Sequence, residues 1–534
     1  MALFKIFKNL FITPILIIAI FILPDILYSF INSKYEFNIM MSELKKLYIL
    51  SLLFSFLRYK VKIFSIFLIY IIIFFQLSSF SYFGKLLAPF DVWLFFVHFS
   101  EVSNGLLDEY MHIVLPFFVV VFSLFISLFV LKQTQKQFFT FKYSGLLLLV
   151  ALLIVPYKIY NKVYIKKIDS VEKYPLINSA SIRNMYKCIG YFCVVTLPRK
   201  LSSKSLDDFK DIKYITNEKN PKRNIILILG ESLRVKSMSV FDYNKDTTPN
   251  LKDLYKTNNI IVKKSISAGT MTKVSVAYLI NQVSSLEDIN KIYTQDSCLF
   301  NLAKSNGFST SFITNQSAND SRFIKSMMCP KYIDNFLTPN ILSQDYDLGD
   351  VISDNDMHLS LKNVDLTKPT FLIYQMQGSH TPYSKKSPPK FKKFKHEYDN
   401  SVLFTDHSLS KFIKHIKEQK NILPTDIMFV SDHGEMLGEN GHSGHGHLTK
   451  EVFSVPFIYS SNYENKELEA KLLNKDIVTH YDVSQMILSS LGYKTTDEDN
   501  NQEVLVMGKD VDGYAGYAIL SISKDDITDI KIYK

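Results

Sequence analysis

The chain has 534 residues, of which 47% are hydrophobic, and a formal net charge of +10. This length exceeds one ordinary domain: apolar residues are concentrated in residues 9–160, whereas residues 222–534 have the charge and turn content of a soluble protein. A positive charge can indicate nucleic-acid binding, but the soluble half has no nucleic-acid-binding motif, so we expect no nucleic-acid partner. Lysine and arginine beside the apolar segments indicate membrane orientation instead.

Five apolar segments predict a transmembrane domain over residues 1–160. Because about 20 apolar residues span a bilayer, the short second segment is expected to extend back through residue 40. The first segment is interpreted as a retained helix, since no small-residue cleavage site follows it and further spans do. The segments lie at about 9–31, 47–57, 63–80, 113–131 and 144–160.

Charged residues between these segments predict which side of the membrane holds the soluble half. Three connecting segments contain basic residues and no acid, and basic segments stay in the cytoplasm. The segment 81–112 has one lysine against four acids. Five spans therefore place residues 222–534 outside the cytoplasm. The basic residues are Lys5 and Lys8, then Arg58, Lys60 and Lys62, then Lys132, Lys136 and Lys142; the mixed segment has Lys85, Asp91, Glu101, Asp108 and Glu109.

Residues 161–221 are interpreted as a connector. Its apolar stretch, residues 182–197, predicts a helix that lies either on the membrane surface or against the soluble domain. The four cysteines leave free thiols or one or two structural disulfides as interpretations, because none has Cys-x-x-Cys spacing. A bridge between Cys298 and Cys329 is compatible with an extracytoplasmic location, although the spacing does not establish it; the other two cysteines are Cys188 and Cys193.

In residues 222–534, short apolar strands alternate with amphipathic helices, which predicts an α/β domain with a parallel sheet. Four predicted strands are followed by residues able to do chemistry. Ligands of open α/β sheets bind beyond the carboxyl ends of the strands, so these groups should converge. The strands are 224–229 before Glu231, 260–264 before Thr270 and Thr272, 370–375 before His380, and 426–430 before Asp432 and His433.

Taken one at a time, these groups have ordinary explanations as caps, turns or salt-bridge partners. Together, Glu231, Asp432 and His433 provide two carboxylates and an imidazole, a ligand set suited to zinc or manganese. A threonine hydroxyl is a poor nucleophile at neutral pH, and a metal ion at its oxygen favours the alkoxide. Thr272 at the start of a helix would also meet backbone N–H groups suited to a phosphoryl group.

A histidine-rich loop follows the Asp432 strand and contains His442, His445 and His447. It offers either a second metal ligand or a general acid for a leaving oxygen, and the alternative is a surface loop whose histidines are incidental.

At these residues the chain resembles the bacterial phosphoethanolamine transferases that decorate lipopolysaccharide, members of the sulfatase and alkaline-phosphatase-like superfamily. The motifs that carry the resemblance are Gly230-Glu231-Ser232-x-Arg234, Thr247-Thr248-Pro249, Gly269-Thr270-x-Thr272-x-x-Ser275-Val276, Gln375-Met376-x-Gly378-Ser379-His380, Tyr398-Asp399-Asn400 and the segment from Ser431 to Gly441. It implies five membrane helices over 1–160, a connector over 161–221 and a sulfatase-like catalytic domain over 222–534.

The resemblance implies that zinc, with manganese as the alternative, is bound by Glu231, Thr272, Asp432 and His433. It makes Thr272 the nucleophile and matches the family's two further active-site histidines to His380 and His445, with His447 as a rival to His445 and room for a second metal ion nearby. It places Thr270, Glu435, Asn315 and Gln316 in the region that holds the lipid headgroup.

The implied activity is transfer of phosphoethanolamine from phosphatidylethanolamine to lipopolysaccharide, at lipid A or a core sugar, or to another envelope glycan, through a covalent phosphothreonine. The expected protein is a monomer in the bacterial inner membrane, in contact with membrane lipids, with its catalytic domain in the periplasm. Many relatives flank the nucleophile with two cysteines, where this chain has Ala268 and Tyr278. The alternatives are a glycerol-phosphate transferase of the lipoteichoic-acid synthase type and a catalytically dead membrane sensor; a sulfatase proper lacks its Cys/Ser-x-Pro-x-Arg element here.

One further feature is a run of lysines between residues 385 and 395, interrupted by Phe391 and Phe394. It predicts a loop that either docks the catalytic domain on the membrane, with its phenylalanines in the headgroup layer, or gathers an anionic acceptor.

Overall fold

The computed structural model describes residues 11–35, 37, 41–83, 86–87, 91–92, 110–134, 143–161, 163, 181–198, 214–316, 328–339, 341–342, 353–495, 503–512, 515–523 and 526–533. The expectations for residues 1–10, 93–109 and 135–142, and for most of the connector, lie outside these ranges. The chain forms two compact units: Met1–Lys204 with Leu437–Ser443, and Ser205–Met436 with Gly444–Lys534. Each unit is described separately.

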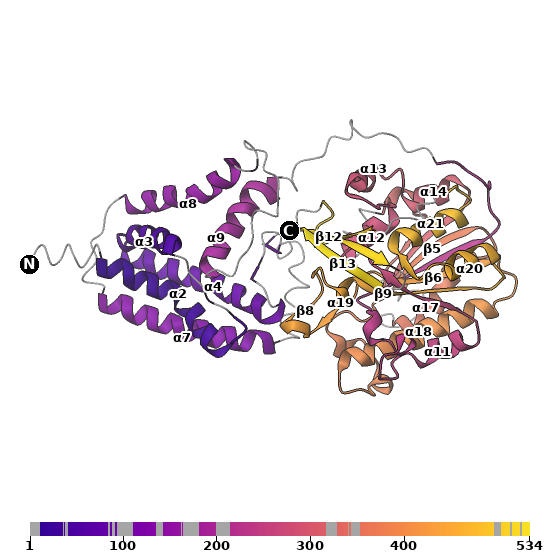
Figure 1. Ribbon diagram of the computed structural model, residues 1–534, viewed down its shortest axis with the longest axis horizontal. Coiled ribbons are helices and arrows are strands. Elements are labelled where there is room, and N and C mark those ends of the chain that lie inside the picture. The colour runs from indigo at the N-terminus through magenta and orange to yellow at the C-terminus, as the bar shows by residue number, and fades with distance from the viewer. Residues whose placement is uncertain are drawn as a thin grey trace, which may run out of the picture. The chain divides into compact units, whose positions relative to one another are not determined.

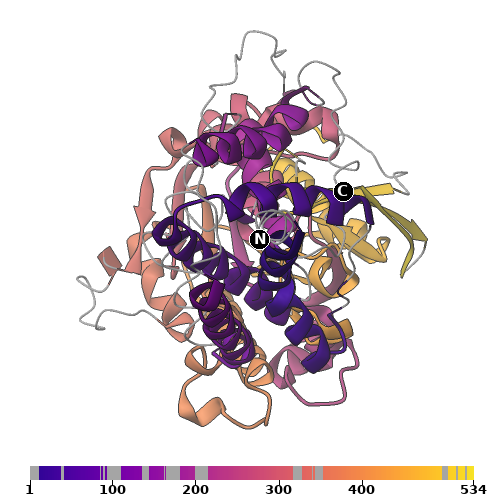
Figure 2. The same ribbon diagram turned by 90° about the vertical axis from the view of Figure 1, so that its left-hand side faces the viewer.

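The first unit is helical (Figures 1 and 2). The Tyr70 hydroxyl ties three helices together, because it donates to the Ile20 carbonyl (2.9 Å) and lies 2.6 Å from Ser127 Oγ. The helices are α2 (Thr13–Ile31), α3 (Met41–Ser55), α4 (Tyr59–Phe83), α7 (Met111–Thr134), α8 (Ser144–Tyr160) and α9 (Ser181–Tyr191), which continues into the π-helix η5 (Phe192–Thr196).

Within the described residues, three helices are long and apolar enough to cross a bilayer: 13–31, 59–82 and 111–132. Large apolar side chains on their outer faces remain exposed, among them Phe67 and Phe125. The prediction of five spans is therefore only partly supported. Helix α3 carries Glu43, Lys45 and Lys46, and α8 has only 17 residues.

Helix α9 corresponds to the apolar stretch of the predicted connector. It packs against α2, α4 and α8 of its own unit, and its first residue, Ser181, donates its backbone N–H to both carboxylate oxygens of Asp25 at 3.2 Å. The helix therefore packs within the helical unit, and its position at the membrane surface stays a prediction.

The second unit has three layers, with an eight-stranded sheet between two groups of helices (Figure 1). Central strand β1 (Asn224–Gly230) is buried along its whole length, as expected for an apolar strand covered on both faces. The strand order is β10-β2-β9-β6-β1-β5-β3-β4. The other strands are β2 (Ile261–Ile266), β3 (Ser309–Thr314), β4 (Asn335–Leu337), β5 (Thr370–Gln375), β6 (Thr425–Ser431), β9 (Ser454–Ser461) and β10 (Ile477–Thr479).

The sheet is mixed, which corrects the prediction of a purely parallel sheet. Strand β9 pairs antiparallel with both β2 and β6, whereas the remaining pairs of this sheet are parallel. A fully buried strand has the same apolar pattern in either direction, so the sequence pattern did not reveal the reversal.

Helices cover both faces of this sheet. One face packs on α12 (Thr272–Ile280), α14 (Leu299–Ser305), α20 (Lys466–Leu473) and α21 (His480–Ser490), whose apolar residues share a core with β1, β5 and β6. Tyr374 of β5 lies on the other face against Phe412 of α18 (Glu397–Glu418), and α11 (Pro249–Lys256) packs on α18. Shorter helices of this unit are α13 (Lys291–Thr294), α17 (Met357–Ser360), α19 (Lys450–Phe453), η6 (Val235–Ser237), η7 (Ser239–Phe241), η8 (Leu286–Asn290), η9 (Pro330–Tyr332), η10 (Asp354–Asp356), η11 (Leu361–Asn363), η12 (Tyr383–Lys385) and η13 (Pro389–Phe391). The short helix η14 (Glu439–Gly441) belongs to the first unit.

Two small sheets complete the fold. Strands β11 (Glu503–Met507), β12 (Tyr517–Ser523) and β13 (Asp526–Tyr533) form an antiparallel sheet, which was not predicted from the sequence. Strands β7 (Met436–Leu437) and β8 (Ser443–Gly444) form the other.

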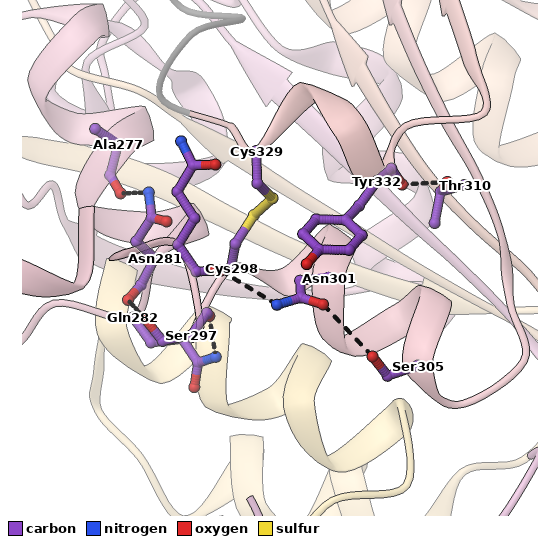
Figure 3. The surroundings of a disulfide bond; sticks show 11 residues. Ala277, Asn281, Gln282, Ser297, Cys298, Asn301, Ser305, Thr310, Cys329 and Tyr332 are labelled. Atoms are coloured by element: carbon purple, nitrogen blue, oxygen red, sulfur yellow. Dashed lines mark hydrogen bonds between the residues drawn. A yellow bond between two sulfur atoms is a disulfide. The ribbon is translucent and has the colours of Figure 1, made fainter. Parts of the chain in front are cut away.

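A disulfide joins Cys298, immediately before α14, to Cys329, immediately before η9 (Figure 3). Both cysteines are buried, and beside them Ser297 accepts a hydrogen bond from the Gln282 side chain at its carbonyl (2.6 Å). Ser297 also donates through its hydroxyl to the Asn281 carbonyl (2.8 Å). The bridged region is therefore connected to the end of α12.

Candidate metal and nucleophile site

The carboxyl ends of three adjacent strands carry the predicted site residues. Strand β1 lies between β5 and β6, with Leu229 opposite Gln375 and Gly230 opposite Ser431. Glu231 and Asp432 therefore follow neighbouring strand ends, and the Asp432 N–H donates to the Gly230 carbonyl (3.0 Å).

Glu231, Asp432, His433 and Thr272 come together at this edge. The Thr272 hydroxyl oxygen lies 3.2 Å from Glu231 Oε2 and 3.2 Å from His433 Nε2. His433 Nε2 is 3.5 Å from Glu231 Oε1 and 3.3 Å from Asp432 Oδ2. The two carboxylates and the imidazole are buried, and Thr272 is half-buried. This is the convergence that the strand ends predicted.

The turn before Thr272 is fixed by close packing and by β11. A Cβ atom on Gly269 would lie 2.8 Å from Val274 Cγ1 and 2.9 Å from the Ser275 nitrogen, so only glycine fits there. The Thr270 N–H donates to the Met507 carbonyl (3.0 Å), and the Met507 N–H donates to the Ala268 carbonyl (2.9 Å). Thr272 then opens α12, so its hydroxyl lies at the positive end of the helix.

The local hydrogen bonds determine which ring nitrogen of His433 faces the cluster. Its Nδ1 lies 3.0 Å from the Gly434 carbonyl, which can only accept, so Nδ1 carries the proton. Burial lowers the pKa of His433 to about 4, so the ring is neutral and Nε2 presents a lone pair to the cluster. Burial, with the nearby charge of Asp432, raises the pKa of Glu231 well above its usual range.

This set of donors fits a divalent cation. One ligand atom each from Glu231, Asp432 and His433 lies within 4.8 Å of the others. Asp432 Oδ1 accepts from the backbone N–H groups of Ser232 (3.0 Å) and His433 (2.7 Å), whereas the buried Oδ2 accepts no hydrogen bond. Two crowded carboxylates and an orphaned buried oxygen are costly without a positive charge beside them. Carboxylate oxygen and imidazole nitrogen are zinc and manganese ligands.

A second cluster adjoins the first. His445 Nδ1 lies 3.2 Å from Glu435 Oε2, and the His445 ring centroid lies 4.4 Å from that of His433 and 5.5 Å from that of His380. Burial raises the pKa of Glu435, but His445 and its hydrogen bond outweigh burial and hold that pKa below the usual value. Of the two rivals in the loop, these contacts favour His445 over His447.

The residues expected to hold a headgroup divide into two groups. Gln316 donates through Nε2 to the Met376 carbonyl (2.9 Å) and lies 3.4 Å from Glu231 Oε2, and the buried hydroxyl of Thr270 has no hydrogen-bond partner. Both are suited to contact a ligand. The Asn315 amide, by contrast, is engaged by Asp354 and Tyr374 (both 2.8 Å), which favours a positioning role.

Asp354, a buried carboxylate beside the site, was not among the predicted site residues. Its Oδ1 accepts from Asn315 Nδ2 (2.8 Å) and the Gln377 N–H (3.0 Å), and its Oδ2 accepts from the Gly378 N–H (2.9 Å). Burial raises its pKa. No local motif could have found it, because its partners lie about 20 to 40 residues away on two other segments.

The Gly378 turn explains how Asp354 acts on the site. Gly378 has a φ of +54°, and a Cβ there would lie 2.6 Å from the Glu231 carbonyl oxygen. The next N–H, of Ser379, donates to that carbonyl (2.9 Å). The loop therefore packs directly on the Glu231 backbone and leads into His380. Asp354 therefore holds both this loop, through the N–H groups of Gln377 and Gly378, and the Asn315 side chain.

The C-terminal segment also supports α12 where relatives have cysteines. The buried Tyr278 donates its hydroxyl to the Val511 carbonyl (2.9 Å). Ala268 and Tyr278 share an apolar cluster with Met507 and Val511. Packing and hydrogen bonds thus hold the turn before Thr272 and the helix that follows it.

Residues 223–493 match the sequence model of the sulfatase family. Among curated proteins, the chain is 25% identical over 365 residues to the Kdo(2)-lipid A phosphoethanolamine 7''-transferase of Escherichia coli (strain K12), which covers 61% of this chain and 62% of that protein. It is also 25% identical over 287 residues to the phosphoethanolamine transferase EptA of Helicobacter pylori, covering 48% of this chain and 52% of that one. The chain thus spans between half and two thirds of the length of these relatives.

Among solved structures, the integral membrane lipooligosaccharide phosphoethanolamine transferase A (EptA) of Neisseria meningitidis shares the fold. The two chains superpose with a TM-score of 0.57 at 16% sequence identity, over 91% of this chain and 96% of the other. The similarity covers the helical unit and the α/β unit.

Proposed function

The chain belongs to the sulfatase family, and from that premise we propose that it is a phosphoethanolamine transferase that uses Thr272 as its nucleophile. The donor is phosphatidylethanolamine, and the acceptor is lipopolysaccharide, at lipid A or a core sugar, or another envelope glycan. The similarity to lipid A phosphoethanolamine transferases supports this choice within the family.

The observation that carries the proposal is the position of the Thr272 hydroxyl. It lies 3.2 Å from both a buried carboxylate and a neutral imidazole, at the first residue of a helix. A threonine in a purely structural role would not need two buried carboxylates beside it, one with an unsatisfied oxygen. A nucleophile needs this environment, because its proton must leave and its charge must be compensated.

Glu231, Asp432, His433 and Thr272 would hold a zinc ion, which when bound supplies the Lewis acidity that makes a threonine hydroxyl reactive at neutral pH. In the first step Thr272 Oγ1 attacks the phosphorus of the donor, an O–P bond forms, and the bond from phosphorus to the diacylglycerol oxygen breaks. Phosphoethanolamine remains on Thr272, and diacylglycerol leaves with a proton. An acceptor oxygen then attacks the same phosphorus and releases the threonine.

Two histidines lie where proton transfer is needed. His445 is half-buried and its Nδ1 is held by Glu435, so its other nitrogen is available to exchange a proton with the leaving and attacking oxygens. His380 lies beside it, with Nδ1 2.6 Å from the Thr381 carbonyl. Thr270 and Gln316 would contact the transferred group. As the alternative to proton transfer, His380 and His445 would serve as ligands of a second metal ion.

We further propose that the chain is a multi-pass protein of the bacterial inner membrane, a monomer whose catalytic domain, residues 222–534, lies in the periplasm. The basic segments beside the apolar helices support this side of the membrane when all five apolar segments span, three of which are helices long and apolar enough to cross a bilayer within the described residues. The Cys298–Cys329 bridge fits an oxidising compartment. In the membrane, the lipid donor, the diacylglycerol product and a lipid-linked acceptor all stay within reach of the site.

The reaction is tested with purified full-length protein in phospholipid nanodiscs. With phosphatidylethanolamine and lipopolysaccharide, we expect release of diacylglycerol and an acceptor that gains phosphoethanolamine. A second reaction with phosphatidylglycerol as the sole donor distinguishes a phosphoethanolamine transferase from a glycerol-phosphate transferase. Turnover with phosphatidylglycerol and not with phosphatidylethanolamine would indicate the glycerol-phosphate transferase. A protein that binds metal but turns over neither lipid would be a catalytically dead sensor, and the proposal would then be wrong.

A further inference from the structure

The segment after His380 carries positive charge that the proposed reaction does not use. Residues 385–395, here the lysine loop, contain six lysines and no acidic residue. Lys386 is half-buried and the other five are exposed. The lysines are Lys385, Lys386, Lys390, Lys392, Lys393 and Lys395.

The lysine loop is held in one shape by contacts with α18. Asn400 accepts from the backbone N–H groups of Lys393 (2.9 Å) and Phe394 (2.7 Å) and donates to the Phe394 carbonyl (3.0 Å). Phe391 is buried against two apolar residues of α18, and Phe394 packs on the same cluster. The prediction that the phenylalanines enter the headgroup layer is therefore wrong for the buried Phe391, whose ring anchors the loop, and stays a prediction for the half-buried Phe394.

Helix α18 extends this positive surface. The Phe391 ring lies 5.0 Å from that of His407, whose pKa is lowered by burial and then by the charges of Lys390, Lys411 and Lys414. One lysine of the loop and two of the helix thus act on the same imidazole. Positive charges of the lysine loop and of α18 therefore lie near the same residue, His407.

The acidic residues that follow the loop in the sequence are engaged elsewhere. Asp399 is buried and pairs with Lys245, with 2.6 Å between Asp399 Oδ2 and Lys245 Nζ. Glu397 accepts from Asn400 Nδ2 (3.3 Å). Each of these two carboxylates therefore has a partner other than the lysines of the loop.

We propose that the lysine loop docks the α/β unit on an anionic lipid surface. The described part of the same chain has three helices long and apolar enough to cross a bilayer, so lipid headgroups are at high local concentration. The loop contains no arginine, the residue suited to bidentate recognition of one phosphate group, whereas flexible lysine ammonium groups suit a diffuse layer of anionic headgroups. This inference goes beyond the proposed transfer reaction and does not depend on which group is transferred.

The test follows backbone hydrogen exchange of residues 385–395 in the full-length protein. The protein is reconstituted in nanodiscs of phosphatidylcholine alone or of phosphatidylcholine with phosphatidylglycerol. We expect exchange to be roughly tenfold slower in the anionic nanodiscs and the difference to vanish at high salt. The measurement needs no turnover, so its failure is distinguishable from failure of the proposed enzyme reaction.

Two variants that remove the same number of positive charges distinguish an effect of the lysine loop from an effect of the protein's total charge. The loop variant is K390Q/K392Q/K393Q/K395Q, and the matched control is K222Q/K420Q/K466Q/K471Q, whose lysines are also exposed on the α/β unit. The loop variant should lose the dependence on phosphatidylglycerol, and the control should keep it.

Equal exchange of wild-type protein in the two nanodiscs would overturn the proposal. So would loss of the effect in both variants, because attraction would then come from total charge. Slower exchange on adding a soluble phosphorylated oligosaccharide to phosphatidylcholine nanodiscs, with no effect of phosphatidylglycerol, would assign the surface to a glycan instead.

Discussion

Replacing Asp354 by asparagine tests whether a carboxylate outside the reacting cluster positions it. Asp354 accepts three hydrogen bonds, from Asn315, Gln377 and Gly378. An asparagine side chain has one acceptor oxygen, which can replace Oδ1 and keep the first two. Its NH2 group then faces the Gly378 N–H, and two donors oppose each other in a buried site.

The structure gives the size of the expected effect. A hydrogen bond to a charged group contributes about 1.5–3 kcal/mol, and an unsatisfied buried donor adds a cost of similar size. Burial raises the pKa of Asp354 because the buried charge is unfavourable. Asparagine carries no charge, so removing this unfavourable term offsets part of the lost free energy. A net shift of about 2 kcal/mol against the native loop changes the equilibrium constant between correctly placed and misplaced loop roughly 30-fold, which is the largest effect on activity that positioning can have. We therefore expect Asp354→Asn to lower kcat/KM by up to about 30-fold.

The assay is hydrolysis of a soluble phosphoethanolamine ester by full-length protein in detergent, with thermal unfolding measured in parallel. Asp406→Asn is the matched control, because Asp406 is also buried and accepts from three donors: Asn250 N (3.1 Å), Asn250 Nδ2 (2.6 Å) and Leu251 N (2.8 Å). Both variants should lose stability, but only Asp354→Asn should lose activity per folded molecule. Equal activities in the two variants would refute the positioning role.

Three further predictions follow from the same structure. Replacing Cys298 and Cys329 by serine opens a crosslink across 31 positions and should lower the free energy of unfolding by about 3–4 kcal/mol, measured by denaturant titration; a loss below about 1 kcal/mol would show that the bridge contributes little. Burial lowers the pKa of His480 to about 4, so its contribution to stability is complete above about pH 6.5 and is lost as pH falls toward 4. His480→Gln, which keeps a donor toward the Ser431 carbonyl, should therefore remove about 2 kcal/mol of the stability difference between pH 7 and pH 5, and an unchanged pH profile would contradict this. Chelation of the metal should lower both Tm and activity, with zinc restoring both, whereas a Tm insensitive to chelator would argue against the proposed ligands.

The sequence predicted those parts of the fold in which burial determines the order of apolar and polar residues along the chain. Strand 370–375 was predicted with the observed bounds, because a central strand covered on both faces is a short run of apolar residues. The site followed from the same strands, since parallel neighbours must end at one edge. The direction of a strand and the pairing of the C-terminal strands leave no such pattern in the sequence. For this reason the antiparallel β9 and the sheet of β11, β12 and β13 were not predicted.

The positions of site residues differ in the same way. Glu231 and Asp432 each directly follow a strand, and His433 is the next residue after Asp432, so their convergence could be predicted from the sequence alone. Asp354 acts through backbone N–H groups of Gln377 and Gly378, which every non-proline residue has, so the sequence contains no signal for the contact. The membrane helices mark a third limit, because α3 carries charges and α8 is short, and hydropathy alone does not decide whether such helices span.

The most direct test of the central claim is to identify the residue that carries the transferred group. Full-length protein is incubated with phosphatidylethanolamine without acceptor, quenched in acid, digested and examined by peptide mass spectrometry, with Thr272→Ala and Thr270→Ala variants alongside. We expect one phosphoethanolamine group on Thr272 in wild-type and Thr270→Ala protein, and no adduct in Thr272→Ala protein that is folded and membrane-inserted. An adduct that persists in Thr272→Ala protein, or that lies on Thr270, would contradict the account.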